Sequence, residues 1–441
     1  LRRMKKYDEY KDSGVAWIGE VPKHWEVKKM NYHCSTITDF VASGSFADLK
    51  RNVQYLGEPD YAMLIRTVDL SSNDKKQPPV YISKSSYEFL SNSNLVGGEI
   101  ILPNIGAVGN VYIVPKLYKH MSLAPNAIMV RSYGNDKFLY YYFKSKPGVD
   151  SLTLIGISTV QDKFNKTELR SLRVLVPPVT EQTAIATYLD THCAKIDNLI
   201  SIQQKRIALL QELKQSVITH AVTKGLNPNV EMKQSGVEWI GDVPKHWKVM
   251  PLKFTGTFGN GLTYSPKDVV DNGILVLRSS NIQNSSLSFE DNVYVSNVSR
   301  DLLVKKGDII ICSRNGSAAL VGKSAFVDKE LNATFGAFMM RYIPNIEKKY
   351  GFYLFQTAIG QYKGYFSTTT INQLTKTTIG EIKIPLAMAE EQAAIASYLD
   401  HKCATIDASI SNAQHQIDLL QEYKQSLITE VVTGKRKVTE N

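Results

Sequence analysis

One long stretch occurs twice in this chain of 441 residues, and this repeat constrains the fold more than any other feature. Residues 181–223 return as residues 391–433, shifted by 210 positions, and both copies contain the motif LLQE-x-KQS-x-IT. The identical pairs include Tyr188/Tyr398, Leu189/Leu399, Asp190/Asp400, Cys193/Cys403, Ile196/Ile406, Asp197/Asp407, Leu210/Leu420 and Lys214/Lys424. Because each copy follows a globular segment, the sequence predicts a molecule built from two similar halves.

Apolar residues recur in both copies at helical spacing. With Leu189 at heptad position a, positions a and e of the first copy are Leu189, Cys193, Ile196, Ile200, Gln203, Ile207, Leu210, Lys214, Val217 and Ala221, and position d adds Leu199 and Leu213. The second copy has Leu399, Cys403, Ile406, Ile410, Ala413, Ile417, Leu420, Leu427 and Val431 at positions a and e. Since neither stretch contains Pro or Gly, the pattern predicts two long amphipathic helices, at 177–225 and 387–435.

Two packing arrangements are compatible with these stripes. Each helix covers its own neighbouring domain, or the two helices pack on each other. In the second case Gln203 in one copy and Ala413 at the same position of the other make a small asymmetry that helps to fix the register.

Composition narrows the class of protein. A chain of 441 residues with 43% hydrophobic and 21% charged residues has room for two to three domains with real cores. No apolar run approaches the roughly 18 residues of a membrane span, and the start LRRMKKYDEYKD is too charged for a signal peptide. The four cysteines (Cys34, Cys193, Cys312, Cys403) lie far apart, which argues against zinc and predicts reduced thiols in a cytoplasmic protein.

The net charge of +10 is concentrated in the two globular segments. Lys and Arg outnumber Asp and Glu by 16 to 12 in residues 31–176 and by 15 to 10 in residues 251–386. The ratio is 5 to 4 in residues 177–230 and 5 to 8 from residue 387 onward. Two moderately basic domains are compatible with nucleic-acid binding, although a merely soluble basic protein has the same balance.

A second repeat precedes each globular segment. Residues 11–30 and 233–252 share the element Gly-Glu/Asp-Val-Pro-Lys-His-Trp and contain all four tryptophans of the chain (Trp17, Trp25, Trp239, Trp247). Pro22 and Pro244 indicate a turn, whose Trp is expected to anchor it on a core or on the long helices. His24 and His246 lack a partner Cys, Ser or Asp motif, so we interpret them as packed turn residues.

In the segments 31–176 and 251–386, strand-like and loop-like stretches alternate in the same order. In the first, residues 61–70, 99–102, 111–115, 127–131 and 172–176 are predicted strands, and residues 136–146 an aromatic-rich helix. Residues 273–281, 307–327, 337–341, 349–362 and 382–385 correspond to them in the second. The order matches while the side chains differ, which indicates one fold with two specificities. The predicted segments are 1–30, 31–176, 177–225, 226–250, 251–386, 387–435 and a tail at 436–441.

The chain resembles the DNA-specificity subunit of type I restriction–modification systems. The resemblance rests on the PKHW segments, the P-x-x-x-EQ-x-AIA-x-YLD element and the two-fold repeat, and it extends from about Lys11 to Thr433. It implies an α+β protein in which two similar α/β target-recognition domains are separated by two long antiparallel, coiled-coil-like helices with an internal pseudo-two-fold repeat. It also implies partners: two methyltransferase subunits that use S-adenosylmethionine, and two translocase–nuclease subunits that use ATP and magnesium. No cofactor or metal is expected on this chain.

Motifs of other classes are absent or weak. The chain has no G-x-x-x-x-G-K-[ST], H-E-x-x-H or G-x-S-x-G sequence and no Asn/Asp-Pro-Pro-Tyr/Phe sequence. One rival function is a metal-dependent nuclease that uses Asp60, Asp74 and Lys76, since carboxylates beside a lysine can hold a metal ion and activate water. A second rival is a coiled-coil scaffold with no role on DNA.

Candidate DNA-reading residues are polar side chains beside glycines in the domain loops. Glycine lets the backbone approach a phosphate closely, and Arg, Asn and Gln make bidentate contacts to base edges. The candidates are Arg66, Asn104, Asn110, Ser158, Thr159 and Gln161 in the first domain, and Arg278, Ser279, Arg314, Asn315, Lys323, Thr369, Asn372 and Gln373 in the second.

The sequence therefore predicts a non-catalytic DNA-binding subunit whose two domains each read one half of an asymmetric, bipartite site. About 40 helical residues at a rise of about 1.5 Å give a spacer of about 60 Å, which corresponds to at most about 18 base pairs. The exposed helix faces and the Trp-containing turns are the expected docking surfaces for the partner subunits.

Overall fold

The computed structural model describes residues 6–71, 77–157, 162–362 and 373–438. The chain divides into two compact units, residues 1–203 together with 415–441, and residues 204–414. Each unit contains one globular domain and one half of each long helix. In the described ranges, no helix is long and apolar enough to cross a membrane.

Two long helices run without interruption, α8 (Val179–Lys224) and α11 (Ala389–Val432). Positions a and e of both are buried or half-buried along their whole length, as the heptads predicted. The prediction for position d was wrong, because Leu199 and Leu213 are 46% and 49% exposed. Around Leu199 and Leu213 the buried stripe is narrower than the sequence indicated, whereas near the helix ends residues outside positions a and e, such as Ile185 and Val222, are buried as well.

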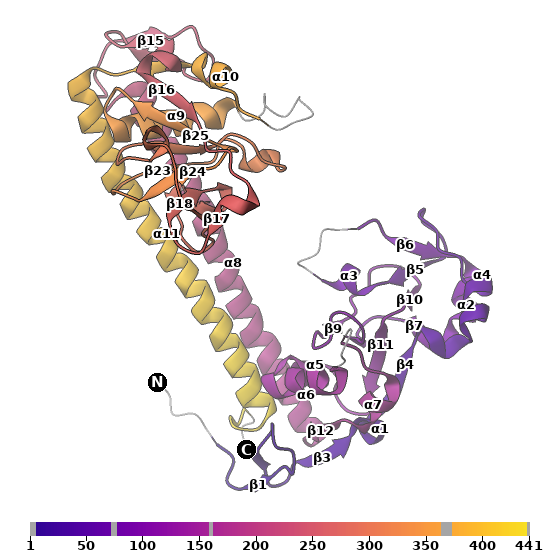
Figure 1. Cartoon of the computed structure of the whole chain (residues 1–441). Coiled ribbons are helices and arrows are strands. Elements are labelled where there is room, and N and C mark those ends of the chain that lie inside the picture. The colour runs from indigo at the N-terminus through magenta and orange to yellow at the C-terminus, as the bar shows by residue number, and fades with distance from the viewer. Residues whose placement is uncertain (1–5, 72–76, 158–161, 363–372, 439–441) are drawn as a thin grey trace. The chain divides into compact units, whose positions relative to one another are not determined.

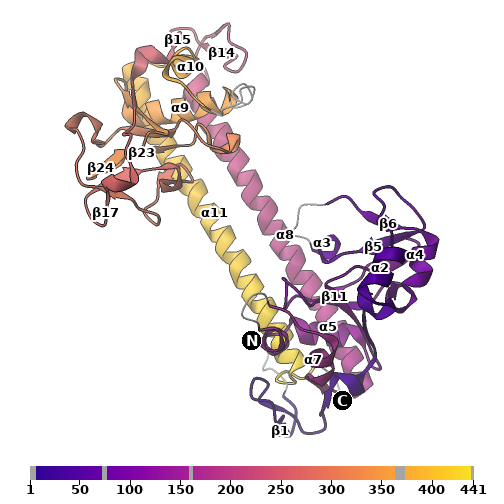
Figure 2. The ribbon, with the colours of Figure 1, turned by 45° about the vertical axis from the view of Figure 1, so that its right-hand side comes forward.

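The two helices pack antiparallel in each unit. In the first unit, Lys424 of α11 donates a 2.6 Å hydrogen bond from Nζ to Oδ1 of Asp197 in α8. In the second unit, Lys214 of α8 lies 2.7 Å from the carboxylate of Asp407 in α11. The second ion pair is the first with the two copies of the repeat exchanged, so the sequence repeat is also a structural repeat. The helices lie side by side in both views of the ribbon (Figures 1 and 2).

Both packing arrangements left open by the sequence occur together. One core of the first unit contains Leu189 and Cys193 of α8, Leu427 of α11, and Phe138 and Tyr142 of the globular domain. The corresponding core of the second unit combines Val222 of α8, Leu399 and Cys403 of α11, and Tyr350 and Phe355 of its domain. Each domain is therefore packed on the ends of both helices.

Two four-stranded sheets form the first domain. One has the order β4-β11-β8-β9 and is antiparallel throughout, and the other has the order β6-β5-β10-β7 with a parallel pair at β5–β10. Their strands are β4 (Cys34–Asp39), β5 (Ala62–Ile65), β6 (Val80–Ile82), β7 (Asn94–Leu95), β8 (Ile100–Pro103), β9 (Tyr112–Ile113), β10 (Met121–Leu123) and β11 (Ala127–Ser132).

The second domain has the same antiparallel sheet and a mixed sheet that differs in its edge strand. Its sheets have the orders β16-β25-β22-β23 and β17-β21-β18-β24, again with one parallel pair, β18–β24. Their strands are β16 (Gly256–Asn260), β17 (Val269–Val270), β18 (Ile274–Leu277), β21 (Tyr294–Val295), β22 (Ile309–Cys312), β23 (Ser324–Phe326), β24 (Ala333–Phe335) and β25 (Met339–Pro344). The predicted correspondence holds for β4, β5, β6, β8, β9, β10 and β11, which match β16, β18, β21, β22, β23, β24 and β25, but the edge strands β7 and β17 have no counterparts.

Short helices surround these sheets. They are α1 (Met30–His33), α2 (Phe46–Asn52), α3 (Thr67–Leu70), α4 (Lys84–Phe89), α5 (Asp136–Lys144), α6 (Lys146–Gly156) and α7 (Lys166–Ser171) in the first unit, and α9 (Lys348–Tyr362) and α10 (Lys376–Gly380) in the second. The expectation of one strand across residues 61–70 was wrong. β5 ends at Ile65 and α3 follows, because the Asp69 carboxylate accepts the backbone N–H of Arg66 and starts a helical turn.

Each domain is entered and left through a two-stranded neck. β3 (Glu26–Lys29) pairs antiparallel with β12 (Arg173–Val176) in the first unit, and β15 (Lys248–Pro251) pairs with β26 (Lys383–Leu386) in the second. Only two residues separate the second strand of each neck from a long helix. They are Pro177 and Pro178 between β12 and α8, and Ala387 and Met388 between β26 and α11. The domain is consequently joined to the helix by adjacent strands at one end.

The two PKHW turns attach each neck to the long helices. Trp25 is fully buried, and its Nε1 donates a 3.0 Å hydrogen bond to Glu181 in the first turn of α8. Trp247 is equally buried and donates a 2.8 Å bond to Glu391 in the first turn of α11. The expectation that the Trp of each PKHW turn anchors it on a core or on the long helices is confirmed for Trp25 and Trp247, which do both. A small hairpin precedes each turn, β1 (Tyr10–Asp12) with β2 (Glu20–Pro22), and β13 (Met232–Gln234) with β14 (Asp242–Pro244).

Each PKHW turn also contacts the C-terminal end of the other long helix. Gly434, just beyond α11, has φ +72°, and a Cβ there would meet the rings of Pro22 and Trp25 at 2.3 and 3.2 Å. Gly225, just beyond α8, has φ +78°, and a Cβ there would meet Trp247 at 3.2 Å. Glycine therefore serves both the left-handed helix end and the close approach of the indole.

The YLD motif explains how the aromatic helices are held. Asp190 of α8 accepts a 2.8 Å hydrogen bond from the hydroxyl of Tyr141 in α5. Asp400 of α11 accepts a 2.7 Å bond from Tyr353 in α9 and pairs with Lys349 at 3.4 Å. Burial is the main reason why the pKa values of both tyrosines are raised, so these hydroxyls stay protonated and donate.

Candidate nucleic-acid interface

Three loop segments meet at one edge of each domain. In the second domain, the loop after β22 is tied to the turn before β25, because the carbonyl of Phe338 accepts the backbone N–H groups of Ser313 and Arg314 at 3.0 and 3.1 Å. The chain that precedes α10 joins them, since Leu374 donates a 2.7 Å bond to the carbonyl of Ser313 and Gln373 bridges to Arg314. The three segments form one backbone frame.

The first domain has the same frame with other side chains. The backbone N–H of Asn104 donates a 3.1 Å bond to the carbonyl of Asn126, just before β11. Phe164 donates a 3.1 Å bond to the carbonyl of Asn104, and Ile105 bridges to Lys163. Asn104, Asn126 and Phe164 thus correspond to Ser313, Phe338 and Leu374. At these positions the two domains differ in every side chain.

Five candidates of the second domain lie close together on this frame. Asn315 donates a 3.1 Å bond from Nδ2 to Oγ of Ser279, and Nζ of Lys323 lies 3.4 Å from the carbonyl oxygen of Ser279. The guanidinium carbon of Arg314 is 5.6 Å from the ring centre of Phe338, and Gln373, beside Arg314, is exposed. The result is a polar and cationic surface assembled from loops that are far apart in the sequence.

The two arginines aligned by sequence occupy equivalent positions but are engaged within the protein. Arg66 follows β5 and pairs with Asp69, with its NH2 group 2.7 Å from Oδ1, and also donates to the carbonyl of Pro78. Arg278 follows β18 and lies 2.7 Å from the carboxylate of Asp291. The hydrogen bond to Asp69 raises the pKa of Arg66, so its charge is retained. Both arginines therefore bind loop residues of their own domain.

The remaining first-domain candidates are dispersed. Asn104 is half-buried and donates from Nδ2 to the carbonyl of Phe164 at 3.0 Å, so it braces the frame. Asn110 is exposed in the loop between β8 and β9. Ser158, Thr159, Gln161, Thr369 and Asn372 lie outside the described residues. For all fourteen candidates, contact with DNA stays a prediction.

Comparison with known proteins decides the family. The family model for the type I restriction modification DNA specificity domain matches residues 31–211 and 244–417. The chain belongs to this family. It is 26% identical over 327 residues to the type I restriction enzyme MjaVIII specificity subunit of Methanocaldococcus jannaschii, covering 69% of this chain and 71% of that protein. It is 27% identical over 205 residues to the type I restriction enzyme EcoKI specificity subunit of Escherichia coli strain K12, covering 44% of each.

A solved structure has the same fold. It belongs to a study of complex assembly and conformational transition of the type I R-M system, and superposes with a TM-score of 0.69 at 14% identity over 93% of this chain and 98% of that one. The predicted fold class, two similar α/β domains with two long antiparallel helices, is confirmed.

Two residues of this specificity-domain frame were not selected from the sequence. Phe338 is 61% exposed beside Arg314, and Asn126 is exposed with φ +69°. Phe338 is apolar and stands in the run AFMMR, which looks like a buried strand, and Asn126 has no glycine beside it. A positive φ and an exposed ring become visible only when the turn before the strand is seen.

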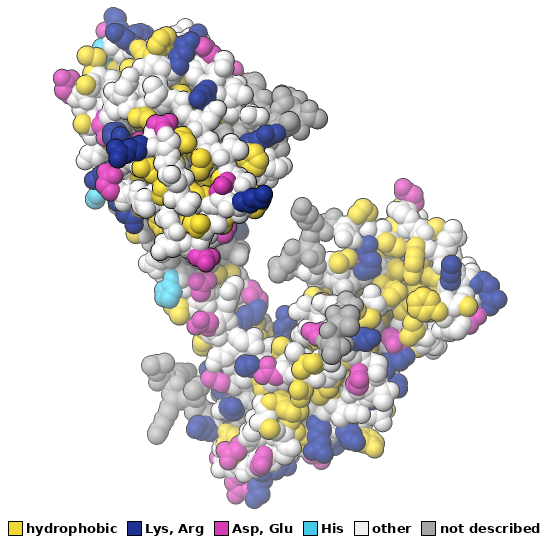
Figure 3. Space-filling view, in the orientation of Figure 1, with side chains coloured by type: hydrophobic (Ala, Val, Ile, Leu, Met, Phe, Trp, Pro, Cys, Tyr) yellow, Lys and Arg dark blue, Asp and Glu magenta, His cyan; other side chains and the backbone are white. Residues whose placement is uncertain are grey.

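Each unit also contains a cavity. The first, of about 580 Å³, is mainly apolar and lies between α2 and the frame, with Phe40, Leu49, Asn104 and Asn126 in its lining. Hydrophobic side chains also gather on the face of this domain over β5 and β10, with Lys and Arg beside them (Figure 3). The second cavity, of about 1060 Å³, is polar and lies between the helices and a hairpin, β19 (Ile282–Gln283) and β20 (Ser286–Leu287).

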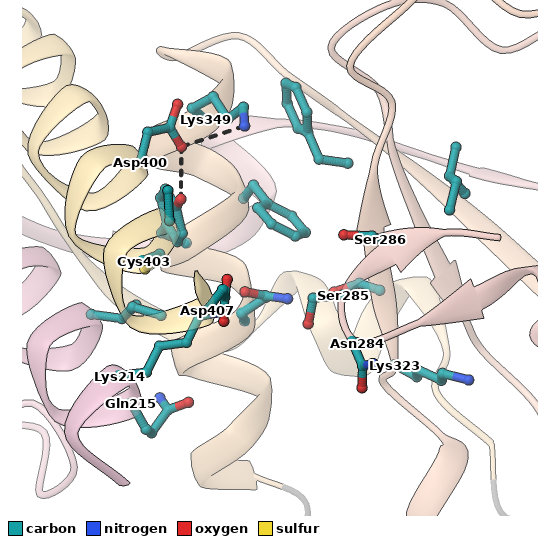
Figure 4. Close-up of a pocket in the computed structure, with 18 of the residues that line it drawn as sticks. Lys214, Gln215, Asn284, Ser285, Ser286, Lys323, Lys349, Asp400, Cys403 and Asp407 are labelled. Carbon is teal, nitrogen blue, oxygen red and sulfur yellow. Dashed lines mark hydrogen bonds and ion pairs between the residues drawn. The ribbon is translucent and has the colours of Figure 1, made fainter. Parts of the chain in front are cut away.

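The larger cavity is closed on one side by ion pairs already described. Figure 4 shows Lys349 and Asp400 at one end of it and Lys214 and Asp407 at the other, all on helices, opposite the hairpin turn Asn284–Ser285. Asn284 and Ser285 have φ of 50° and 63°, as a tight two-residue hairpin turn requires. Lys323 reaches from this hairpin side toward the frame, which links the cavity wall to the candidate surface.

The residues of the nuclease hypothesis do not form a site among the described residues. Asp60 is exposed on a turn, where Oδ1 accepts the backbone N–H of Tyr61, while Asp74 and Lys76 lie outside the described residues. His24 and His246, the other catalytic-looking residues, lie 2.6 and 3.0 Å from Glu181 and Glu391 and belong to the turn that anchors each Trp.

Proposed function

We propose that this specificity subunit reads a bipartite, asymmetric DNA site, with each globular domain binding one half. The observation that carries the proposal is the shared backbone frame with different side chains. Where the second domain exposes Phe338 and Gln373, the first exposes Asn126 and Lys163. A frame that is kept while its exposed side chains change is suited to two readers of different sequence.

Charge supports DNA as the ligand. Lys and Arg exceed Asp and Glu in both domains, by 16 to 12 and by 15 to 10. Phosphate neutralisation by such residues supplies affinity, while side chains at base edges supply specificity. We propose that the chain itself is non-catalytic, and that S-adenosylmethionine, ATP and magnesium are bound by its partners.

We propose that the long helices set the gap between the half-sites. α8 and α11 contain 46 and 44 residues without interruption, and each belongs to both units. The necks and the Trp–Glu contacts fix each domain to the helix ends. A rigid joint at both ends is what a spacer needs to hold two readers in register.

We propose that two methyltransferase subunits, and with them two translocase–nuclease subunits, dock on exposed helix faces. Leu209 and Leu213 on α8 are 64% and 49% exposed, and the equivalent residues of α11, Leu419 and Tyr423, are 50% and 51% exposed. Apolar side chains spaced by four residues lie on one face of a helix. Their presence at equivalent positions of both copies fits two copies of one partner.

The test of the proposed function is to map methylated adenines in DNA from cells that express the chain with its methyltransferase partner. Replacing residues 31–176 by the same domain of another member of the family should change one half of the methylated motif and leave the other half and the gap intact. Replacing residues 251–386 should change only the other half. If either exchange altered both halves, the assignment of one half-site to each domain would be wrong.

A further inference from the structure

The turn before β25 presents an aromatic ring in a fixed position. The Phe338 carbonyl accepts three hydrogen bonds, from the backbone N–H of Ser313 at 3.0 Å, from that of Arg314 at 3.1 Å, and from Oγ of Ser313 at 3.0 Å. The turn is closed by a 2.8 Å bond from Met339 N–H to the carbonyl of Gly336. The backbone is thus immobilised, while the ring of Phe338 is 61% exposed.

The surroundings of this ring are cationic and polar. The guanidinium of Arg314 lies over the ring at 5.6 Å, and Asn315, Ser279 and Lys323 lie on the same frame. A cation over one side of the ring restricts its rotamer and leaves the rest of the ring for a ligand. An exposed apolar side chain is unremarkable alone. Here the ring of Phe338 is held in place beside hydrogen-bond donors and positive charges. An apolar ring and donors suit contact with a base edge, and the positive charges suit contact with the flanking phosphates.

The first domain supports the assignment by contrast. Asn126 occupies the equivalent place, with its carbonyl bound by Asn104 N–H at 3.1 Å, and its side chain is exposed. An exposed Asn pairs with adenine, whereas Phe makes apolar contact with the methyl group of thymine. The same place on the frame therefore presents two chemistries.

We propose that Phe338 is a specificity-determining residue of the second domain that contacts the C5 methyl group of a thymine in its half-site, with Arg314 positioning the ring. This inference rests on the proposed function, since it requires that residues 251–386 read DNA. Apolar contact of this kind distinguishes thymine from cytosine and from uracil, which lack the methyl group.

The chain offers a matched control. Phe254 lies in the same domain, is 62% exposed and has Lys253 over its ring at 5.4 Å, but it is in the turn after β15, and its neighbours Lys253 and Asn345 are not part of the frame. Phe338→Ala and Phe254→Ala each remove the ring of a phenylalanine that is about three-fifths exposed. Both variants should keep the thermal midpoint of the wild type, which separates a binding effect from a folding effect.

The experiment uses the chain with its methyltransferase partner and the DNA site found by methylation mapping. Each thymine of the second half-site is replaced in turn by deoxyuridine, and binding is measured by titration. For the wild type and Phe254→Ala, one replacement should weaken binding roughly fourfold, the effect of one buried methyl group. Phe338→Ala should bind the unmodified site roughly tenfold more weakly and should no longer respond to that replacement.

The outcomes separate the two levels of the argument. If the wild-type complex methylates no defined motif, both the proposed function and this inference are wrong. If it methylates a bipartite motif but no deoxyuridine replacement weakens binding, or if the second half-site contains no A·T pair, only the assignment of Phe338 is overturned. Equal responses of Phe338→Ala and the wild type to the same replacement would overturn it as well.

Discussion

At the scale of single residues, the contacts of Glu391 explain why the EQ motif follows each domain. Its carboxylate accepts bonds from the indole of Trp247 at 2.8 Å, from His246 at 3.0 Å and from the backbone N–H of Met388 at 3.2 Å. One side chain thus joins the neck, the PKHW turn and the start of α11. Glu181 receives Trp25 and His24 in the same way.

Removing this carboxylate should destabilise the fold. Glu391→Ala leaves the N–H of the fully buried Trp247 unpaired, which costs about 1–3 kcal/mol of the free energy of unfolding. The control is Glu390→Ala, which removes an exposed charge from the same first turn and keeps the Trp247 contact. Urea unfolding followed by Trp fluorescence compares them. Equal losses in the two variants would mean that the helix terminus, and not the Trp contact, is responsible.

The same carboxylate predicts a dependence on pH. Burial alone would raise the pKa of Glu391, but the hydrogen bonds from His246 and Trp247 outweigh it and lower the pKa below its ordinary value of 4.5. A carboxyl with a lowered folded-state pKa stabilises the fold above pH 4.5, and this contribution is lost as the pH falls through the folded-state value. The difference in unfolding free energy between the wild type and Glu391→Gln should therefore shrink below pH 4.5. A difference that stayed constant down to pH 3 would contradict this account.

At the scale of the elements, the register of α8 against α11 is marked by two equivalent ion pairs. Lys424–Asp197 and Lys214–Asp407 belong to different units but involve the same positions of the repeat. Because these side chains are partly exposed, each ion pair contributes little to the free energy of unfolding. Their main effect is to disfavour other registers of the two similar helices.

Reversing one charge should weaken this register, and restoring the opposite charge should recover it. Lys424→Glu places two negative charges together and should cost about 0.2–1 kcal/mol at low salt. Adding Asp197→Lys should return most of that loss, and 1 M salt should reduce the effect by screening. A double-mutant cycle by urea unfolding measures the coupling. A coupling energy of zero at low salt would show that the pair does not help to set the register.

The partner surface is tested on α8. Leu209→Glu with Leu213→Glu should leave unfolding of the free chain unchanged, since both residues are largely exposed, and should weaken capture of the methyltransferase subunit at least tenfold by loss of apolar burial. The control is Ala208→Glu with Gln211→Glu, at two exposed positions in the same stretch of α8, which adds the same two negative charges and keeps both leucines. Capture that is lost with this control, or retained with the double leucine variant, would place the docking surface elsewhere.

At the scale of the whole molecule, the helices should act as a ruler. Deleting seven residues between Asp197 and Lys214 and seven between Asp407 and Lys424 preserves both ion pairs and the heptad pattern. This removes about 10 Å of helix, so the gap in the methylated motif should shorten by about three base pairs. Deletion from one helix alone breaks the register and serves as the control. An unchanged gap in the paired deletion would show that the helices do not set the spacing.

The sequence by itself determined the long helices, the repeat and the correspondence of the domains. Heptad positions such as Leu189 and Leu399 carry a strong signal, because an amphipathic helix of this length repeats its pattern many times. The prolines before each helix and the Trp of each turn are equally local signals. Short strands have a weaker sequence signal. β5 and α3 lie in one strand-like run, and the contact of Asp69 with Arg66 marks where the strand ends and the helix begins.

Only the tertiary structure determined which loop side chains are exposed and which are engaged within the protein. Arg66 and Arg278 look like free readers in the sequence, but Asp69 and Asp291 engage them. Phe338 looks like a core residue, yet hydrogen bonds from residues more than twenty positions away hold it exposed. Periodicity is a property of neighbours along the chain, whereas exposure and pairing in loops depend on segments that meet only after folding.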